Sequence, residues 1–392
     1  MSKVPAFTLM LFLFCIVPMV NAEKIEHLWA YSINDFRVID ISSNDELISV
    51  GIGQTINGTW TEGGIVVLSL NGRQMWNYTG DFGYCYTTVS NNSHIAVGCR
   101  DGTIMLFDKN GNLLWKFNAM TKVKRVAISE DGSIIAASSY DGNLYVFSRE
   151  GLKWKRYLED KLAGVSISKD NQLIAVGGFS GYVYILSLNG EILGAYLTKM
   201  PVFAVDFDKT YVVAGDYNGT VVYLSPNGTL IWKIQLRGSI WDLETFGGKI
   251  LVGTANGDFS LLSNNGNILW EEHLGNTTKI GVFDVSIFKR YLVGVAVDTE
   301  NCGGVIYLVD ENGTILWKFE KADEYFLSVD SNNNQIIVGT SIWDNKRKAW
   351  NKSKIYAFGI VENKTKKKTC GVGFILIGML IVIFLMKKLM KN

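Results

Sequence analysis

The chain has 392 residues, 48% of them apolar, and a formal net charge of +1. It is long enough to bury a large core, and its balanced charge gives no long-range attraction to nucleic acid, so no nucleic-acid partner is predicted. The three histidines, His27, His94 and His273, lie far apart without ligand-like spacing, which argues against a zinc or copper site. The sequence predicts no metal and no other cofactor.

Residues 1–22 have the features of a secretory signal peptide. Lys3 precedes an apolar stretch from Pro5 to Val20, and Val20-Asn21-Ala22 offers small residues for cleavage. The alternative is an uncleaved N-terminal anchor. We expect residues 23–360 to lie outside the cytoplasm.

A short motif recurs seven times along residues 36–319. In it, a turn glycine is followed by a strand that usually centres on tryptophan, as in Asn110-Gly111-Asn112-Leu113-Leu114-Trp115. The central positions are Trp76, Trp115, Trp154, Gly194, Trp232, Trp270 and Trp317, spaced 39, 39, 40, 38, 38 and 47 residues apart. A period near 40 with all-β signals predicts a β-propeller of four-stranded blades.

One unit shows how each blade forms. Residues 126–129, 134–138, 143–147 and 153–157 alternate apolar and polar positions, and Gly, Asp or Ser residues separate them. The third turn ends on a glycine, which suits a type I turn followed by a left-handed bulge. The tryptophan then covers the neighbouring sheet, so we expect poorer packing where Gly194 replaces it.

These segments resemble a known repeat. Residues 101–115 and 304–317 are similar to the pyrroloquinoline-quinone-like (PQQ-like) β-propeller repeat, and the resemblance covers about residues 24–360. The turn here is one residue shorter, and Leu106, Val146 and Ile185 replace the family's alanine. The family includes quinoprotein dehydrogenases and cofactor-free scaffolds, so the resemblance implies the fold and leaves the activity open.

The end of the repeat region predicts how the ring closes. Residues 326–329, 335–339 and 354–358 supply three strands of an eighth blade, and residues 26–31 form an isolated outer strand that contains Trp29. Pairing this strand with the last blade removes an open sheet edge. We therefore expect eight blades, with seven as the alternative if one unit is degenerate.

The C-terminal segment has the features of a membrane anchor. A basic linker at 361–369 precedes an uncharged run of 17 residues at 370–386, and a short basic tail follows at 387–392. As a helix the run spans roughly 26 Å, close to the thickness of a bilayer core. The sequence predicts a single-pass protein of the cell membrane, with the propeller outside and the tail in the cytoplasm.

Cysteines and glycosylation acceptors fit an exterior location. Cys85 and Cys99 flank a turn symmetrically and are expected to face each other as a disulfide or as two buried thiols. Nine Asn-X-Ser/Thr acceptors occur, several of them in hairpin turns. They are Asn57, Asn77, Asn91, Asn218, Asn227, Asn276, Asn312, Asn351 and Asn363.

Two groups of residues are candidate binding sites. Three long loops, at 51–64, 297–304 and 340–353, belong to neighbouring blades once the ring closes. Their candidate anchor residues are Trp60, Trp343, Asp344, Lys346, Arg347, Lys348 and Trp350. The alternative is that these loops are ordinary variable loops whose tryptophans fold back onto the blades.

The second group lies near the starts of the inner strands, at the mouth of the central channel. Aromatic and basic side chains there could hold an anionic or sugar-like ligand, or could simply pack and solvate the funnel. They are Arg37, Tyr84, Lys124, Arg125, Phe203, Trp241, Phe283 and Tyr325. Asp40, Asp206 and Glu244, in the same strands, could bind a cation or hydrogen-bond neighbouring strands.

These features favour a non-enzymatic, membrane-anchored scaffold that binds a protein or glycan partner. The alternatives are a quinone-dependent dehydrogenase and the ligand-sensing ectodomain of a membrane complex. The dehydrogenase would need a calcium-type site and usually a disulfide between adjacent cysteines, and no adjacent pair occurs.

Overall fold

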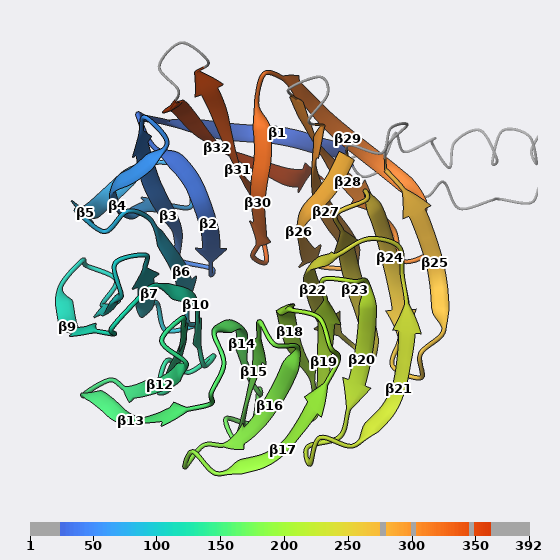
Figure 1. The fold of residues 1–392 in the computed structure, drawn as a ribbon. Helices are drawn as coiled ribbons and strands as arrows, with labels where there is room; N and C mark the ends of the chain where they lie inside the picture. Colours follow the sequence, from blue (N-terminus) through green and yellow to red (C-terminus); the bar gives the residue numbers. More distant parts are fainter. Residues whose placement is uncertain (1–23, 275–279, 299–302, 345–348, 362–392) are drawn as a thin grey trace, which may run out of the picture. The chain divides into compact units, whose positions relative to one another are not determined.

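The computed structural model describes residues 24–274, 280–298, 303–344 and 349–361. In these ranges every regular element is a β-strand, and the strands form eight antiparallel sheets of four strands each (Figure 1). The predicted all-β propeller with eight blades is confirmed, and the seven-bladed alternative is wrong.

Each blade runs from an inner strand beside the channel to an outer strand at the rim. Blades 1–4 consist of β2 (Arg37–Ser43), β3 (Leu47–Ile56), β4 (Thr59–Ser69), β5 (Gln74–Gly80); β6 (Cys85–Val89), β7 (Ile95–Cys99), β8 (Thr103–Phe107), β9 (Leu113–Asn118); β10 (Val123–Ile128), β11 (Ile135–Ser139), β12 (Asn143–Ser148), β13 (Gly151–Tyr157); and β14 (Leu162–Ile167), β15 (Leu173–Gly178), β16 (Tyr182–Ser187), β17 (Ile192–Leu197).

Blades 5–8 follow the same order. They consist of β18 (Val202–Asp208), β19 (Tyr211–Asp216), β20 (Thr220–Leu224), β21 (Leu230–Gln235); β22 (Ile240–Phe246), β23 (Lys249–Thr254), β24 (Asp258–Ser263), β25 (Ile268–His273); β26 (Ile280–Phe288), β27 (Tyr291–Asp298), β28 (Gly303–Val309), β29 (Ile315–Ala322); and β30 (Tyr325–Ser331), β31 (Ile336–Asp344), β32 (Ala349–Val361), β1 (Lys24–Asn34).

The N-terminal strand closes the ring as predicted. β1 is the outer strand of blade 8 and pairs with β32, so the two ends of the repeat region share one sheet (Figure 1). The inner strand of blade 1 is also joined to the first two strands of blade 8, because Val38 donates its N–H to Ser341 Oγ on β31 at 3.0 Å and Ile41 donates to Ser328 Oγ on β30 at 3.1 Å. Because of this closure, neither blade 1 nor blade 8 has an open edge where the two blades meet.

The recurrent tryptophans join each blade to the next. Trp76 Nε1 donates to the Lys109 carbonyl at 3.0 Å, and its ring lies against Gly111 in the turn of blade 2. Trp29, Trp154, Trp232 and Trp270 make the equivalent bond, at 2.8–3.1 Å. The turn position that each indole covers suits only glycine, for two reasons. Its φ is positive, and the indole ring leaves no room for a Cβ.

Three blades depart from this pattern. In blade 7, Trp317 makes no such bond among the described residues, and its ring meets Phe358 of blade 8 edge to face at 5.0 Å. The turn before Trp154 is one residue shorter, and the preceding Trp115 stacks on Phe147 at 4.6 Å while its buried indole N–H has no hydrogen-bond partner in the described part of the chain. At Gly194, a Cβ would lie 2.2 Å from the carbonyl carbon of Asn227. The expectation of a loose seam there is therefore wrong, because the next turn moves in against the glycine.

Several predicted segments lie outside the described residues. They are the signal peptide (1–22), all of the basic linker except Val361, the transmembrane run (370–386) and the tail (387–392). Among the residues that the structure does describe, no helix is long and apolar enough to span a bilayer.

Candidate functional site at the mouth of the central channel

A cavity of about 480 Å³ opens at one end of the central channel. Much of its wall comes from the starts of the inner strands, where six blades each contribute at least one side chain. Seven residues that the sequence singled out line it: Arg37, Trp60, Tyr84, Lys124, Arg125, Phe203 and Trp241. We call this cavity the channel mouth.

The sequence analysis missed four aromatic residues of the same wall. Tyr86 is the second inner-strand tyrosine of blade 2, and Tyr140, Phe179 and Tyr217 precede the turns between the second and third strands of blades 3, 4 and 5. An aromatic residue immediately before three successive turns was a signal available in the sequence. These turns and the starts of the inner strands lie at the same end of the ring, so their side chains converge.

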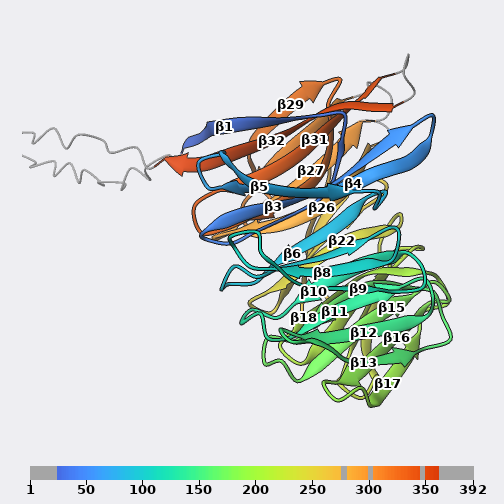
Figure 2. The same cartoon turned by 90° about the vertical axis from the view of Figure 1, so that its left-hand side faces the viewer.

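The long loops of blades 1 and 8 join this surface. In blade 1, β3 and β4 extend as a hairpin in which the Trp60 ring meets Tyr84 edge to face at 4.7 Å. In blade 8, β31 and β32 pair Trp343 with Trp350, whose rings are 5.2 Å apart. In the side view the two hairpins point to the same side of the ring (Figure 2).

One arginine connects the blade 8 hairpin to the mouth. The Arg37 guanidinium lies 4.6 Å from the centre of the Trp350 ring, and Tyr325 meets the same ring at 5.8 Å. The two sites predicted separately therefore form one continuous surface. The tryptophans are half-buried against other rings, so the alternative of tryptophans that fold back onto the blades is correct in part.

Five predicted positions add little to this surface. Asp344 ends β31 and pairs with Ala349 across the hairpin. Lys346, Arg347 and Lys348 lie outside the described residues, as does the side chain of Phe283.

The basic side chains of the mouth lie against aromatic rings. Lys124 Nζ is 5.3 Å from the Tyr86 ring centre and 5.9 Å from that of Phe203, and it donates to the Tyr86 hydroxyl at 3.1 Å. Lys122 lies over Tyr140 at 4.7 Å, and Arg100 over Tyr84 at 5.7 Å. Such contacts hold a cation without neutralising its charge.

Two of these cations are poorly compensated. Burial, together with the neighbouring charges of Arg125 and Lys122, lowers the pKa of Lys124 to about 8, and Tyr84 and Asp40 offset this only in part. Burial also lowers the pKa of Arg37, whose buried Nε has no hydrogen-bond partner among the described residues. None of the residues that line the mouth is acidic.

Arg125 marks the boundary between the mouth and the channel below it. Its Nη1 lies 3.5 Å from Asp40 Oδ1. Burial alone would lower the pKa of Arg125, but the carboxylates of Asp40, Asp242 and Asp284 raise it. Arg125 is therefore fully charged and already paired.

Below Arg125 the wall of the channel is acidic. Six carboxyl side chains line it: Asp40, Asp206, Asp242, Glu244, Asp284 and Asp330. Burial raises the pKa of Asp40, Asp206 and Glu244, raises that of Asp284 with a further contribution from Asp242, and raises that of Asp330 to about 7. We call these six residues the carboxyl ring.

The members of the carboxyl ring bind the next blade. Asp40 accepts the Thr87 N–H at 3.1 Å, Asp242 accepts the Val285 N–H at 3.1 Å, and Asp284 accepts from Val329 and Ser328. Asp206 accepts the Thr245 N–H and hydroxyl, both at 2.9 Å, and Asp330 accepts the Ser43 N–H and hydroxyl. For Asp40 and Asp206 the structure thus supports hydrogen bonding between strands.

The described residues do not supply the calcium-type site that a quinone-dependent dehydrogenase needs. Among them, no group of three or more acidic, histidine or cysteine side chains is arranged to hold a metal ion. The carboxylates that come nearest to such a group already accept hydrogen bonds across the blade seams. Cys85 and Cys99 are bonded to each other but are not adjacent in sequence.

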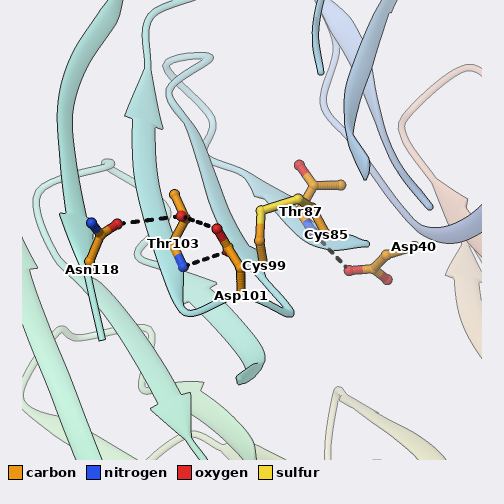
Figure 3. The surroundings of a disulfide bond; sticks show 7 residues. All are labelled: Asp40, Cys85, Thr87, Cys99, Asp101, Thr103 and Asn118. Carbon is orange, nitrogen blue, oxygen red and sulfur yellow. Dashed lines mark hydrogen bonds between the residues drawn. A yellow bond between two sulfur atoms is a disulfide. The ribbon is translucent and has the colours of Figure 1, made fainter. Parts of the chain in front are cut away.

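The disulfide supports the wall of the mouth. Cys85 on β6 faces Cys99 on β7, and the two form a disulfide, which confirms this alternative over free thiols (Figure 3). Cys85 lies between Tyr84 and Tyr86, and nearby Thr87 carries the bond to Asp40. The covalent link and the cross-blade bond therefore hold both tyrosines.

Comparison with known proteins agrees with the architecture. A family model described as outer membrane protein assembly factor BamB matches residues 180–324, and one for the WD domain, G-beta repeat, matches residues 111–148. Residues 180–324 are thus similar to PQQ-like propeller repeats and residues 111–148 to a WD repeat, while the eight-bladed architecture itself is given by the sheet topology of the described residues.

Solved structures share the fold at low identity. BamB from Moraxella catarrhalis is 13% identical with a TM-score of 0.62, covering 86% of this chain and 98% of that one. Chaetomium thermophilum Sqt1, bound to the N-terminus of the ribosomal protein L10, is 13% identical with a TM-score of 0.67, covering 82% and 99%. The computationally designed Ika8 protein is 15% identical with a TM-score of 0.66, covering 81% and 96%. No curated protein sequence matches the chain.

Proposed function

We propose that the protein is a membrane-anchored scaffold that binds a partner protein at the channel mouth, outside the cytoplasm. One observation carries the proposal: the long hairpins of blades 1 and 8 and the mouth form a single surface of aromatic and basic side chains. Trp, Tyr and Arg are the residues that most often anchor protein interfaces. Sqt1, which has the same fold, was crystallised with a peptide segment of another protein.

The anchoring part of the proposal rests on the two ends of the sequence. The apolar run at 370–386 would hold the chain in the membrane, and the signal peptide would place the propeller outside. We expect the full chain to remain in the membrane pellet after alkaline extraction and a chain ending at Val361 to be released. Retention of the shortened chain would contradict the anchor.

The binding surface can be tested by capture from membranes with the full-length protein. Trp60→Ala and Trp350→Ala each remove an aromatic anchor, and we expect at least tenfold less of the main partner to be recovered. Tyr211→Ala is the matched control, because Tyr211 is a partly exposed aromatic residue at the opposite end of the blades, where it begins β19 directly after the first turn of blade 5. Equal recovery by all variants would exclude this surface.

We propose that the protein has no enzymatic activity of its own. Reconstitution with pyrroloquinoline quinone and calcium, followed by dye reduction with alcohol and sugar substrates, tests the dehydrogenase alternative. Turnover above that of the protein without quinone would refute the scaffold proposal in its non-enzymatic form.

A further inference from the structure

We propose that the channel mouth is a carboxylate-binding site that takes an acidic peptide segment of the partner, with Lys124 and Arg37 as the groups that bind it. The inference rests on the proposed function and names the chemistry that the mouth recognises. It starts from the charge of the cavity wall, which has three cations, Arg37, Lys124 and Arg125, and no acid among the lining residues.

Only two of these cations are available to a ligand. Arg125 is paired with Asp40 at 3.5 Å. Lys124 and Arg37 lie against rings, and no described carboxylate is within ion-pair distance of either. A carboxylate beside them would replace the solvation that burial removed, which is the condition under which charge-assisted hydrogen bonds are strong.

Uncharged donors surround the two cations. Tyr84, Tyr86, Tyr140 and Tyr217 all line the mouth. Burial, with Tyr84 and Tyr86 nearby, raises the pKa of Tyr140 to about 12, so its hydroxyl remains protonated and can donate a hydrogen bond. A cavity of about 480 Å³ lies in the usual range for compact ligands, so it can take a few residues of a peptide.

The packing of the rings favours a peptide over a sugar. Tyr140, Phe179, Phe203 and Tyr217 meet one another edge to face in succession, at interplanar angles of 79°, 88° and 75°. Rings packed this way cover one another and present no broad flat platform for a pyranose ring. An anionic glycan is therefore the competing occupant that the experiment must exclude.

The carboxyl ring limits how deeply an acidic segment can enter. It lies directly below Arg125 and carries six acidic groups. An incoming carboxylate is attracted at the mouth and repelled further down. We therefore expect the acidic segment to bind across the mouth without threading the channel.

The experiment uses the purified full-length chain in detergent and isothermal titration. The probe is acetyl-Gly-Glu-Asp-Glu-Gly-amide, and its matched control is acetyl-Gly-Gln-Asn-Gln-Gly-amide. We expect the acidic peptide to bind and the amide peptide to bind at least tenfold more weakly. Equal binding of the two would overturn the proposal, as would binding of neither.

Two variants separate Lys124 from general surface charge. We expect Lys124→Met to weaken binding of the acidic peptide about 10- to 100-fold, the usual effect of losing a charged hydrogen-bond partner. Lys169→Met is the control: Lys169 is an exposed lysine paired with Glu130, outside the mouth, and its removal should change affinity less than twofold. If the two variants weaken binding equally, the peptide is held by nonspecific attraction to surface charge, and the proposal is overturned.

The pH profile gives a readout that a purely structural lysine would not show. Peptide carboxylates are charged above about pH 5, and Lys124 loses its proton around pH 8, so affinity should fall between pH 7 and pH 9.5. The Lys124→Met variant should have a flatter profile over this range. An unchanged profile in that variant would contradict the role of Lys124.

Two further ligands identify the source of the carboxylate. If citrate binds as tightly as the peptide, the ligand is a small carboxylate and the assignment to a peptide is overturned. A hexuronate tetrasaccharide that binds more tightly would overturn it in favour of a glycan. Partner capture that depends on Trp60 but is not competed by the acidic peptide would refute this inference and leave the proposed function standing.

Discussion

The channel mouth and the carboxyl ring are built on the same inner strands but differ in how their charged groups are compensated. In the ring, at least five of the six carboxyl groups accept hydrogen bonds from the next blade, as Asp206 does from Thr245. At the mouth, Lys124 and Arg37 lie over aromatic rings without a described carboxylate partner. The carboxyl groups of the ring thus join neighbouring blades, whereas Lys124 and Arg37 at the mouth remain available for a ligand.

The difference shows why burial alone does not identify a site. Burial shifts the pKa of groups in both regions, downward for Lys124 and upward for Asp330. Only the hydrogen-bond partners distinguish them, because the ring's carboxyl groups accept bonds from backbone N–H groups and hydroxyls of the next blade, whereas Lys124 and Arg37 have no described carboxylate partner. Removing a charged group should therefore destabilise the protein in the carboxyl ring but not at the mouth.

The largest expected effect concerns the disulfide that holds the mouth tyrosines. Cys85→Ala with Cys99→Ala removes a link that closes a loop of 14 residues, and we expect about 3 kcal/mol lower unfolding free energy. Urea denaturation measures it. Unchanged stability with unchanged peptide affinity would show that the carboxyl-ring bonds alone hold blade 2.

The second effect is a pH dependence of stability. The pKa of Asp330 is raised to about 7 in the folded protein, so the folded state binds its proton more tightly than the unfolded chain and stability falls as pH rises from about 4 to 7. Between pH 5 and pH 8, Asp330 should contribute a loss of about 2–3 kcal/mol. Asp330→Asn should reduce the pH dependence by that amount, and an unaltered profile would contradict the prediction.

A smaller loss is expected from Asp206→Ala. The substitution leaves the Thr245 N–H without the acceptor that holds it at 2.9 Å, whereas the Thr245 hydroxyl keeps the Phe207 carbonyl at 2.6 Å, and an unsatisfied buried donor costs about 1–3 kcal/mol. We expect about 2 kcal/mol lower stability by denaturation. Peptide affinity at the mouth should change less than twofold, since Asp206 is not among the residues that line the mouth.

The smallest effect on stability is expected at the mouth itself. Lys124→Met removes a buried cation with no carboxylate partner, so the unfolding free energy should stay within about 1 kcal/mol of the original or rise. A large destabilisation would mean that Lys124 is a structural residue like those of the carboxyl ring, and the contrast between the two regions would fail.

Much of the fold was predictable because its signals are local. The turn glycine and the tryptophan four residues later recur with a period near 40, and each copy specifies its own turn and outer strand. The closure by residues 24–34 followed from counting strands. The close approach of Asn227 to Gly194 did not follow, because it depends on how two blades sit against each other.

The candidate site was predictable only in part. Arg37, Tyr84 and Lys124 could be placed at the mouth because each begins an inner strand. Tyr140 and Tyr217 were missed, since their contribution depends on the direction of side chains at a turn. The union of Trp350 with Arg37 joins residues more than 300 positions apart, and no local pattern contains that contact.

By itself, then, the sequence determined the repeat, favoured eight blades over seven and indicated the strand that closes the ring, since these follow from turn chemistry and alternation within about 40 residues. The tertiary structure alone decided that the carboxyl groups bind their neighbours and that Arg125 pairs with Asp40, while Lys124 and Arg37 have no carboxylate partner among the described residues. Charge compensation depends on distances of a few ångströms between different blades, and these are set only when the ring closes.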